Sequence, residues 1–167
     1  MGGTMMCKSV CFTGHRNLKS STQELSVLLY EYLEKIITKL EVTDLYAGGS
    51  IGWDTLAAQT VLRLREIYPQ IKLHLILPCS NEEQTAGWSV EQRKEFYHIL
   101  SLADNVEYTS EHYFNGCMKA RNVRLVELAN VCCISYWNVN NFRSGTGQTV
   151  RMAQNKGLRV MNLYDML

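Results

Sequence analysis

Residues 44–68 read DLYAGGSIGWDTLAAQTVLRLREIY, a short apolar run, a glycine-rich turn and an amphipathic stretch in direct succession. The run at 44–47 is typical of a buried strand, which the glycines of residues 48–52 bring to an end. From Trp53 to Tyr68 the apolar residues recur at helical spacing and would form one inward-facing stripe: Leu56, Ala57, Val61, Leu64 and Ile67. The segment therefore predicts a strand, a tight turn and a helix, which is the repeating unit of a parallel sheet.

The same alternation continues along the chain in both directions. Further strands are expected at residues 9–13, 71–77, 106–108, 131–137 and 158–163. Further helices are expected at residues 22–40, 90–103, 116–129 and 145–156. Capping boxes are expected to open the first two of these helices, with Ser21 paired to Glu24 and Ser89 paired to Gln92. Six alternations with short connections predict an α/β fold, a three-layer Rossmann-like sandwich with a mostly parallel sheet of about six strands.

The composition limits the classes of protein to which the chain can belong. Of its 167 residues, 46% are hydrophobic and 20% are charged, which excludes a disordered protein or a coiled coil. Lys and Arg number 17 and Asp and Glu number 16, a net charge of +1, so we do not expect nucleic-acid binding. No apolar stretch approaches the ~20 residues that span a bilayer, so no membrane partner is expected. We expect one domain at residues 7–163 behind a flexible lead-in at residues 1–6.

The cysteines point to a reducing compartment. They include no C-x-x-C pair and accompany no secretory signal: Cys7, Cys11, Cys79, Cys117, Cys132 and Cys133. We interpret them as reduced thiols, mostly in the core, of a cytoplasmic protein. The four histidines are scattered as well, so we expect no metal site.

Distinctive residues follow nearly every predicted strand. In a parallel sheet of this kind, ligands bind at the carboxyl ends of the strands. The segments that follow the strands would therefore meet at one edge of the sheet: residues 13–16, 48–54, 78–88, 112–116 and 138–147. This concentration predicts a binding site at that edge.

The glycine-rich turn at residues 48–52 is the strongest single candidate within this edge. Gly48, Gly49 and Gly52 would let a phosphate approach the main chain, and the following helix start offers free N–H groups and a partial positive charge. The alternative is a tight strand-to-helix turn with no ligand. The pattern G-G-x-x-G differs from the dinucleotide fingerprint G-x-G-x-x-G, so an ordinary NAD-dependent dehydrogenase is not favoured. Asp54 would either stabilise the helix start or accept hydrogen bonds from ribose hydroxyls, and it would repel an adjacent phosphate.

A second glycine-lined helix start lies at residues 142–149. It differs from a P-loop because Phe142 stands where the first glycine is required and Gln148 stands where the lysine is required. ATP hydrolysis of the P-loop type is therefore not expected. The glycines Gly145 and Gly147 still suit a phosphate or a ribose phosphate.

Several side chains near the strand ends could contact such a ligand. Arg16 and Arg121 are candidates for paired hydrogen bonds to phosphate, and a solvated surface arginine is the alternative for each. His15 would serve as a donor or an acid/base, or else as a structural histidine. Three tryptophans lie near strand ends, where any could stack on a base although helix packing is expected for at least two: Trp53, Trp88 and Trp137. Of the three, we favour Trp88 as the residue that stacks on the base of the ligand.

Four motifs can be read together: FTGHR at residues 12–16, GGSIGWD at 48–54, GCMKARN at 116–122 and SGTGQTV at 144–150. In this order and spacing they resemble the YpsA-like family of the SLOG superfamily, which also holds the DprA/Smf proteins and the LOG enzymes. The resemblance covers about residues 7–163. It implies a Rossmann-like domain that binds a nucleotide or nucleotide-derived molecule, with ADP-ribose and NAD-like compounds among the ligands proposed for the family. It also implies a homo-oligomer, expected to be a dimer, and for some members a link to stress or cell-division control.

The motifs and the resemblance together predict the residues of the site. The expected ligand contacts are Gly14, His15, Arg16, Gly48, Gly49, Gly52, Asp54, Trp88, Arg121, Asn122, Gly145, Thr146, Gly147 and Thr149. The candidates for catalysis are Arg121, Asp54 and His15. No metal and no defined cofactor is expected beyond the nucleotide-derived ligand itself.

The resemblance to LOG enzymes bears on whether the protein is a catalyst. LOG enzymes cleave the N-glycosidic bond of nucleoside monophosphates, and their Met-x-x-Arg-Lys segment matches residues 118–122 apart from Asn122. Their glutamate has no counterpart, because Gln148 and Thr149 stand at the carboxylate positions. We therefore favour a nucleotide-binding sensor or regulatory module. The alternatives are a LOG-like N-glycosidase and a DprA-like protein that binds single-stranded DNA.

Overall fold

The computed structural model describes residues 7–167, which alternate between strands and helices as predicted. The lead-in predicted at residues 1–6 lies outside the described residues. The strands are β1 (Ser9–Gly14), β2 (Asp44–Ala47), β3 (Lys72–Leu77), β4 (Asn105–Tyr108), β5 (Cys132–Tyr136) and β6 (Arg159–Asn162). The helices are α1 (Thr22–Lys39), α2 (Trp53–Ile67), α3 (Asn81–Gln84), α4 (Val90–Leu102), α5 (Cys117–Leu128) and α6 (Gly145–Lys156).

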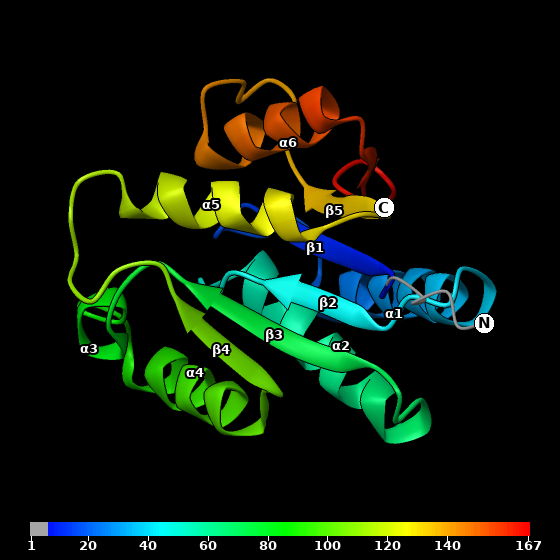
Figure 1. The fold of residues 1–167 in the computed structure, drawn as a ribbon, viewed down its shortest axis with the longest axis horizontal. Coiled ribbons are helices and arrows are strands. Elements are labelled where there is room, and N and C mark those ends of the chain that lie inside the picture. The colour runs from blue at the N-terminus through cyan, green and yellow to red at the C-terminus, as the bar shows by residue number, and fades with distance from the viewer. Residues whose placement is uncertain (1–6) are drawn as a thin grey trace, which may run out of the picture.

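Six parallel strands form one sheet in the order β4-β3-β2-β1-β5-β6 (Figure 1). Cys11 of β1, for example, is paired with Tyr46 of β2 on one side and with Cys133 of β5 on the other. The chain starts at β1 in the middle of the sheet, adds β2 to β4 on one side, and then crosses over to add β5 and β6 on the other. The predicted Rossmann-like α/β fold with a parallel sheet of about six strands is confirmed, and its topological switch point lies between β1 and β5.

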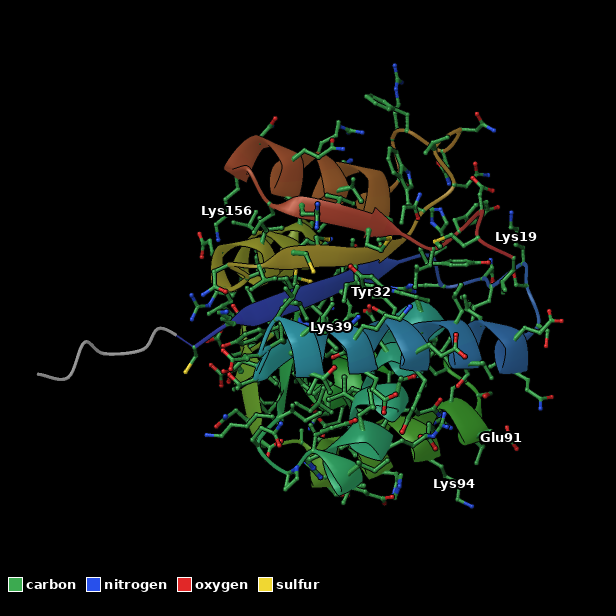
Figure 2. The ribbon with its side chains drawn as sticks, turned by 90° about the vertical axis from the view of Figure 1, so that its right-hand side faces the viewer. Lys19, Tyr32, Lys39, Glu91, Lys94 and Lys156 are labelled. Carbon is green, nitrogen blue, oxygen red and sulfur yellow. The ribbon has the colours of Figure 1, made fainter. Side chains whose placement is uncertain are left out.

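Helices cover both faces of the sheet. Helices α1, α2 and α4 pack together on one face, and α5 and α6 pack together on the other. Figure 2 shows α1, which carries the labelled Tyr32 and Lys39, lying along the first of these faces. The central strand β1 is buried on both sides as a result: Val10 and Phe12 belong to the larger core, whereas Cys11 between them belongs to the smaller core under α5 and α6.

One of the two predicted capping boxes forms. The Ser89 side chain accepts from the backbone N–H of Gln92, and the Gln92 side chain accepts from the backbone N–H of Ser89. The box predicted at Ser21 and Glu24 is wrong, because Ser21 occupies the cap position of α1 but makes no side-chain cap bond. The first turn of α1 is exposed, so water can satisfy its free N–H groups without the serine.

The end of α6 is tied to the end of α5 at the amino edge of the sheet, opposite the carboxyl edge where both helices begin. The Lys156 ammonium group, labelled in Figure 2 at the end of α6, donates to the carbonyls of Val126, Glu127 and Ala129 at 2.8, 2.9 and 2.6 Å. These carbonyls belong to the last turn of α5 and the residue after it, where a positive charge is favourable. The lysine thus satisfies carbonyls that α5 itself leaves without a donor.

Candidate functional site

A crevice of about 320 Å³ opens at the carboxyl end of β1, beside the start of α6, the helix that follows β5. Its walls come from four segments that lie far apart in the sequence: the end of β1, the turn before α2, helix α5 and the start of α6. In Figure 1 the arrows of β2 and β3 point to the left-hand side, which is the side on which α5 begins. The crevice therefore lies at the topological switch point of the sheet, where open α/β folds bind their ligands.

The end of β1 supplies the floor of the crevice. A side chain at Gly14 would collide with the indole of Trp53, so only glycine fits between the strand and α2. The backbone of His15 is held on both sides, because its N–H donates to Tyr136 at 3.1 Å and its carbonyl accepts from Trp53 at 3.2 Å. Gly14 and His15 both line the crevice.

The ring of His15 has a defined protonation state. Its Nε2 accepts from the backbone N–H of Asn138 at 2.8 Å, which requires a lone pair on Nε2 and places the proton of the neutral ring on Nδ1. Burial lowers the pKa of His15 below its ordinary value. The imidazole is therefore neutral near pH 7, and one of its two nitrogens is already committed to the backbone.

Two glycines of the turn at residues 48–52 pack against residues that line the crevice. Gly52 has a φ of +78°, and a side chain there would collide with the Arg16 carbonyl. At Gly48 an added Cβ would lie 2.5 Å from Nη1 of Arg121. The turn is therefore packed against the Arg16 backbone and the Arg121 guanidinium, and none of its three glycines lines the crevice. Ser50 and Asp54, which flank Gly52, do line it.

Arg121 and Asp54 form a buried group of opposite charges in the crevice wall, with exposed fractions of 4% and 6%. The Arg121 guanidinium donates to the Gly48 carbonyl, to Ser50 Oγ at 3.4 Å and to Asn122 Oδ1 at 2.8 Å. Asp54 Oδ2 accepts from the backbone N–H of Ser50 at 3.2 Å. Within residues 7–167 the two charges form no direct ion pair.

Burial shifts both groups towards their neutral forms. It raises the pKa of the Asp54 carboxyl, and the nearby Arg121 charge opposes this shift. It lowers the pKa of Arg121, and the Asp54 charge opposes that shift in turn. Because the crevice wall is poorly solvated, each group depends on the opposite charge of the other to stay ionised. A ligand group that approaches the two meets a strong local electric field.

The start of α6 forms the opposite wall. Ser144 caps the helix, with its Oγ accepting from the Gly147 N–H at 3.0 Å and with a φ of −62°, so serine is accommodated at this position without strain. In the described part of the chain, the backbone N–H groups of Gly145 and Thr146 have no acceptor. These two donors and the positive end of the helix favour an anion.

Two hydroxyl groups add to this wall. Thr13 and Thr146 line the crevice and are only 6% and 8% exposed. Neither hydroxyl makes a hydrogen bond to another described residue, in contrast to Thr149, which donates to the Gly145 carbonyl at 2.8 Å. Each hydroxyl can therefore hydrogen-bond to water or to a ligand group in the crevice.

The structure brings together eight of the predicted ligand contacts and leaves six elsewhere. The residues that line the crevice are Gly14, His15, Arg16, Asp54, Arg121, Asn122, Gly145 and Thr146. Those that do not are Gly48, Gly49, Gly52, Trp88, Gly147 and Thr149. Lining residues that the sequence did not single out include Thr13, Ser50, Met118 and Ser144. Three of these stand inside the quoted motifs beside a glycine or an arginine, so proximity in sequence was the available signal.

The aromatic residues occupy different places. Trp53 is fully buried, stacks on Tyr136 with ring centroids 5.3 Å apart, and belongs to the core. Trp137 donates from its indole to the Asn141 carbonyl at 3.1 Å and so supports the loop before α6. Trp88 lies outside the crevice and lines a neighbouring hollow.

The described part of the chain offers no arrangement of side chains for a metal ion. Within residues 7–167, no group of three or more His, Cys, Asp or Glu side chains lies close enough together to hold one. No helix in that range combines the length and the apolar character that crossing a membrane would need. All six cysteines are free thiols.

Comparison with known proteins identifies relatives of the chain. The family model YpsA, described as the YspA SLOG family, matches residues 10–163. The UPF0398 protein of Ligilactobacillus salivarius is 26% identical over 117 residues, which cover 66% of this chain and 63% of that protein. The prophage-derived protein YoqJ of Bacillus subtilis is 31% identical over 91 residues, which cover 53% and 52%. The chain thus spans less than two thirds of the length of these relatives.

Two solved structures share the fold. DNA processing protein A (DprA) from Streptococcus pneumoniae matches with a TM-score of 0.58 and 21% identity, covering 92% of this chain and 49% of that one. The structure of TM1055 matches with a TM-score of 0.58 and 18% identity, covering 95% of this chain and 79% of that one. At these identities the similarity is one of fold.

Proposed function

The chain belongs to the YspA SLOG family, as its motifs predicted, and from that membership and the geometry of the crevice we propose that it binds a nucleotide or nucleotide-derived ligand. The observation that carries the proposal is the meeting, in one crevice, of a free helix start, two unpaired threonine hydroxyls and two arginines. A phosphate at the start of α6 can accept from the backbone donors, the hydroxyls and Arg16, while Arg121 adds positive charge from the opposite wall.

The charges orient the ligand in the crevice. Its phosphate would lie at the start of α6, where Gly145 and Thr146 offer backbone donors, and beside Arg16, whose side chain makes no hydrogen bond or ion pair with the described residues. Asp54 would repel a phosphate at the other wall but can accept hydrogen bonds from ribose hydroxyls. The ribose would therefore lie towards Asp54 and Asn122.

A thermal-shift experiment tests this proposal. AMP, NAD and ADP-ribose are added to the protein, and a ligand at 100 times its dissociation constant adds about 2.7 kcal/mol of stability. For a domain of this size that corresponds to roughly 5–10 °C in melting temperature. Melting curves that stay unchanged at millimolar concentrations of every nucleotide would overturn the proposal.

Arg16 provides a matched pair of variants. Arg16→Ala removes an exposed cation at the crevice, and we expect it to weaken nucleotide binding about 10- to 100-fold, the range for a hydrogen bond between charged groups. Arg159→Ala removes an arginine that is likewise exposed, at the amino end of β6, and we expect it to leave affinity unchanged. Equal losses in both variants would mean that only the overall charge matters.

We propose that the protein acts as a sensor or regulatory module, in line with the link to stress or division control that the family resemblance implies. The positions that hold a carboxylate in LOG enzymes carry Gln148 and Thr149, whose side chains bond to the Arg143 and Gly145 carbonyls. Neither side chain is an acid. A bound nucleotide would then persist as a signal and not be consumed.

A second candidate function is hydrolysis of an N-glycosidic bond, and one observation favours it. Asp54 supplies a carboxyl group from a different segment, and it lines the same crevice as Arg121. A carboxylate near the anomeric carbon stabilises an oxocarbenium-like transition state. Incubation with AMP, NAD or ADP-ribose followed by chromatography for the free base separates the two functions. Release of the free base that is lost in both Asp54→Asn and Arg121→Ala would favour the hydrolase.

We further propose that residues 7–163 form one domain of a cytoplasmic homodimer. Six free thiols are in keeping with a reducing compartment, and dimerisation is what the family resemblance implies. Light scattering after size-exclusion chromatography measures the mass directly. A monomer at micromolar concentration would contradict the dimer without affecting the proposed ligand site.

A further inference from the structure

A second hollow, of about 500 Å³, adjoins the crevice and shares Arg16 and Met118 with it. We call this hollow the side chamber. It lies on the β3 side of the switch point, and its walls include Ile51, Cys79, Glu83, Ala86, Trp88 and Tyr113. A ligand that fills the crevice and continues past Arg16 would therefore enter the side chamber.

The two hollows differ in charge. The crevice holds the α6 start, Arg121 and Asp54, the side chamber holds the carboxylate of Glu83, and Arg16 lines both. Glu83 Oε2 accepts from the Tyr113 N–H at 2.9 Å and from Ser80 Oγ at 3.0 Å. The first of these bonds is the main cause that holds the pKa of Glu83 below its ordinary value. The Glu83 carboxylate, which also lies 3.7 Å from His112 Nδ1, disfavours phosphate in the side chamber and leaves Arg16, at the boundary, as the cation nearest to a bridging phosphate.

The side chamber also offers surfaces for an uncharged group. Trp88 is half-buried, with its ring set edge-on to Phe96 at a centroid distance of 5.7 Å, and Tyr113 is 61% exposed. Among the described residues, Glu83 Oε1 and the Trp88 indole N–H make no hydrogen bond. An acceptor, a donor and two aromatic rings are the groups that bind a sugar or a nucleoside.

We propose that the side chamber holds the second half of a two-part ligand, in which a nucleotide in the crevice is joined through a diphosphate beside Arg16 to a sugar or a second nucleoside. The second half is uncharged and carries hydroxyl or amino groups that donate to Glu83. This inference rests on the proposed function, because it assumes that the crevice holds a nucleotide. It narrows the ligand class to molecules longer than a mononucleotide.

Isothermal titration with matched ligand pairs tests the proposal. ADP is compared with ADP-ribose, and UDP with UDP-glucose, so that each pair differs only in the group that would enter the side chamber. In at least one pair the two-part ligand is expected to bind ~10-fold tighter or more, the gain from about one well-placed hydrogen bond. Ala86→Trp, which places a large side chain at an exposed position of the chamber wall, is expected to abolish that gain and to leave the affinity for ADP or UDP within about twofold.

Tyr113→Ala provides a second variant with a matched control. Tyr113 lines the chamber, whereas its neighbour Phe114 does not, and both rings are exposed, by 61% and 46%. We expect Tyr113→Ala to reduce the gain by about threefold or more and Phe114→Ala to leave it intact. Because Tyr113 is exposed, its loss leaves the fold in place even if Ala86→Trp does not fold.

The outcomes separate this inference from the proposed function. Binding of ADP or UDP with no gain in affinity for either two-part ligand would overturn the proposal that the side chamber binds the second half of the ligand. It would leave the proposed function standing. A gain that survives Ala86→Trp and Tyr113→Ala would also overturn it. No binding by any of the four ligands would overturn both.

Discussion

Gly48 packs against Arg121 behind the crevice wall and Gly145 lines the crevice, and a methyl group meets different surroundings at the two positions. A Cβ at Gly48 would lie 2.5 Å from Arg121 Nη1 and 2.8 Å from Asp54 Oδ2, whereas at Gly145 the nearest atom, Asn122 Nδ2, is 4.0 Å away. We expect Gly48→Ala to lower the free energy of unfolding by about 1–3 kcal/mol, the usual cost of overpacking. Gly145→Ala should leave it unchanged or raise it by about 0.5–1 kcal/mol, because alanine restricts the unfolded chain. Urea denaturation measures both, and equal effects would contradict the packing argument.

The role of Gly48 illustrates what a sequence can and cannot predict at the scale of a residue. Its position after a strand predicted that a phosphate of a ligand approaches the main chain, with a tight turn as the alternative. The structure places the guanidinium of Arg121, which is 73 residues away in the chain, against Gly48. The need for a glycine follows from local sequence, but the identity of the approaching group depends on how distant elements pack. Gly14, opposed by Trp53, is a similar case.

Asp44 at the start of β2 predicts a dependence of stability on pH. It accepts from Thr43 Oγ1 at 2.8 Å and lies 2.7 Å from His74 Nε2. Burial alone would raise the pKa of Asp44, but these hydrogen bonds outweigh burial and hold that pKa below its ordinary value. A carboxyl group whose pKa is lower in the folded state stabilises the fold above its unfolded pKa, and this contribution is lost as the pH falls through the folded pKa.

The expected result is a steeper acid destabilisation in the wild type than in Asp44→Asn. Between about pH 5 and pH 2, the wild type should lose about 1–2 kcal/mol more of its free energy of unfolding than the variant does. The control is Asp165→Asn, whose carboxylate is 72% exposed and pairs only with Lys19 at the surface. Parallel pH profiles for the wild type and Asp44→Asn would show that the hydrogen bonds of Asp44 with Thr43 and His74 contribute no net stability.

At the scale of elements, two serines have the same capping-box signature in the sequence, yet we expect their substitution by alanine to affect stability differently. Ser89 accepts from the Gln92 N–H at 3.1 Å and completes a capping box at the start of α4. Ser21 stands at the same position of α1 and makes no such bond. We expect Ser89→Ala to lower the free energy of unfolding by about 1 kcal/mol, and Ser21→Ala to change it by less than about 0.5 kcal/mol. Thermal unfolding measures both, and a larger loss for Ser21→Ala would mean that its cap forms in solution.

The elements themselves were largely predictable from the spacing of apolar residues. The last helix begins at Gly145 and ends at Lys156 as predicted, because Ser144 caps its start and Gly157, with a φ of +90°, ends it. The short helix α3 was missed and taken as part of a polar loop. Its four residues bury nothing, so no periodic pattern marks it. Helices that lack a buried face leave no such signal in a sequence.

At the scale of the whole molecule, alternation of strands and helices predicted a parallel sheet but did not fix the order of its strands. Several orders satisfy right-handed crossovers with short connections. The observed order places β5 beside β1, and this one pairing brings the end of β1 to the start of α6. It also leaves Trp88, which follows β3, on the other side of the switch point in the side chamber. The order of strands therefore decides which predicted residues share the crevice.

The charge of the whole molecule predicts how it responds to single-stranded DNA, a question raised by the fold shared with DNA processing protein A. Proteins that hold a single strand without sequence preference use a positively charged groove several nucleotides long. This chain has a net charge of +1, and the cations that line its crevice, Arg16 and Arg121, face the carboxyl group of Asp54. We expect no anisotropy change for a labelled oligothymidine at physiological salt and up to about 10 µM protein, since basic proteins bind non-specifically with dissociation constants of about 10⁻⁴–10⁻⁶ M at that salt and this chain lacks their basic excess. Weak binding at low salt that AMP displaces would place a terminal phosphate in the crevice and agree with the proposed ligand. Binding that resists excess AMP and weakens steeply with salt would instead require a separate DNA surface and contradict the prediction.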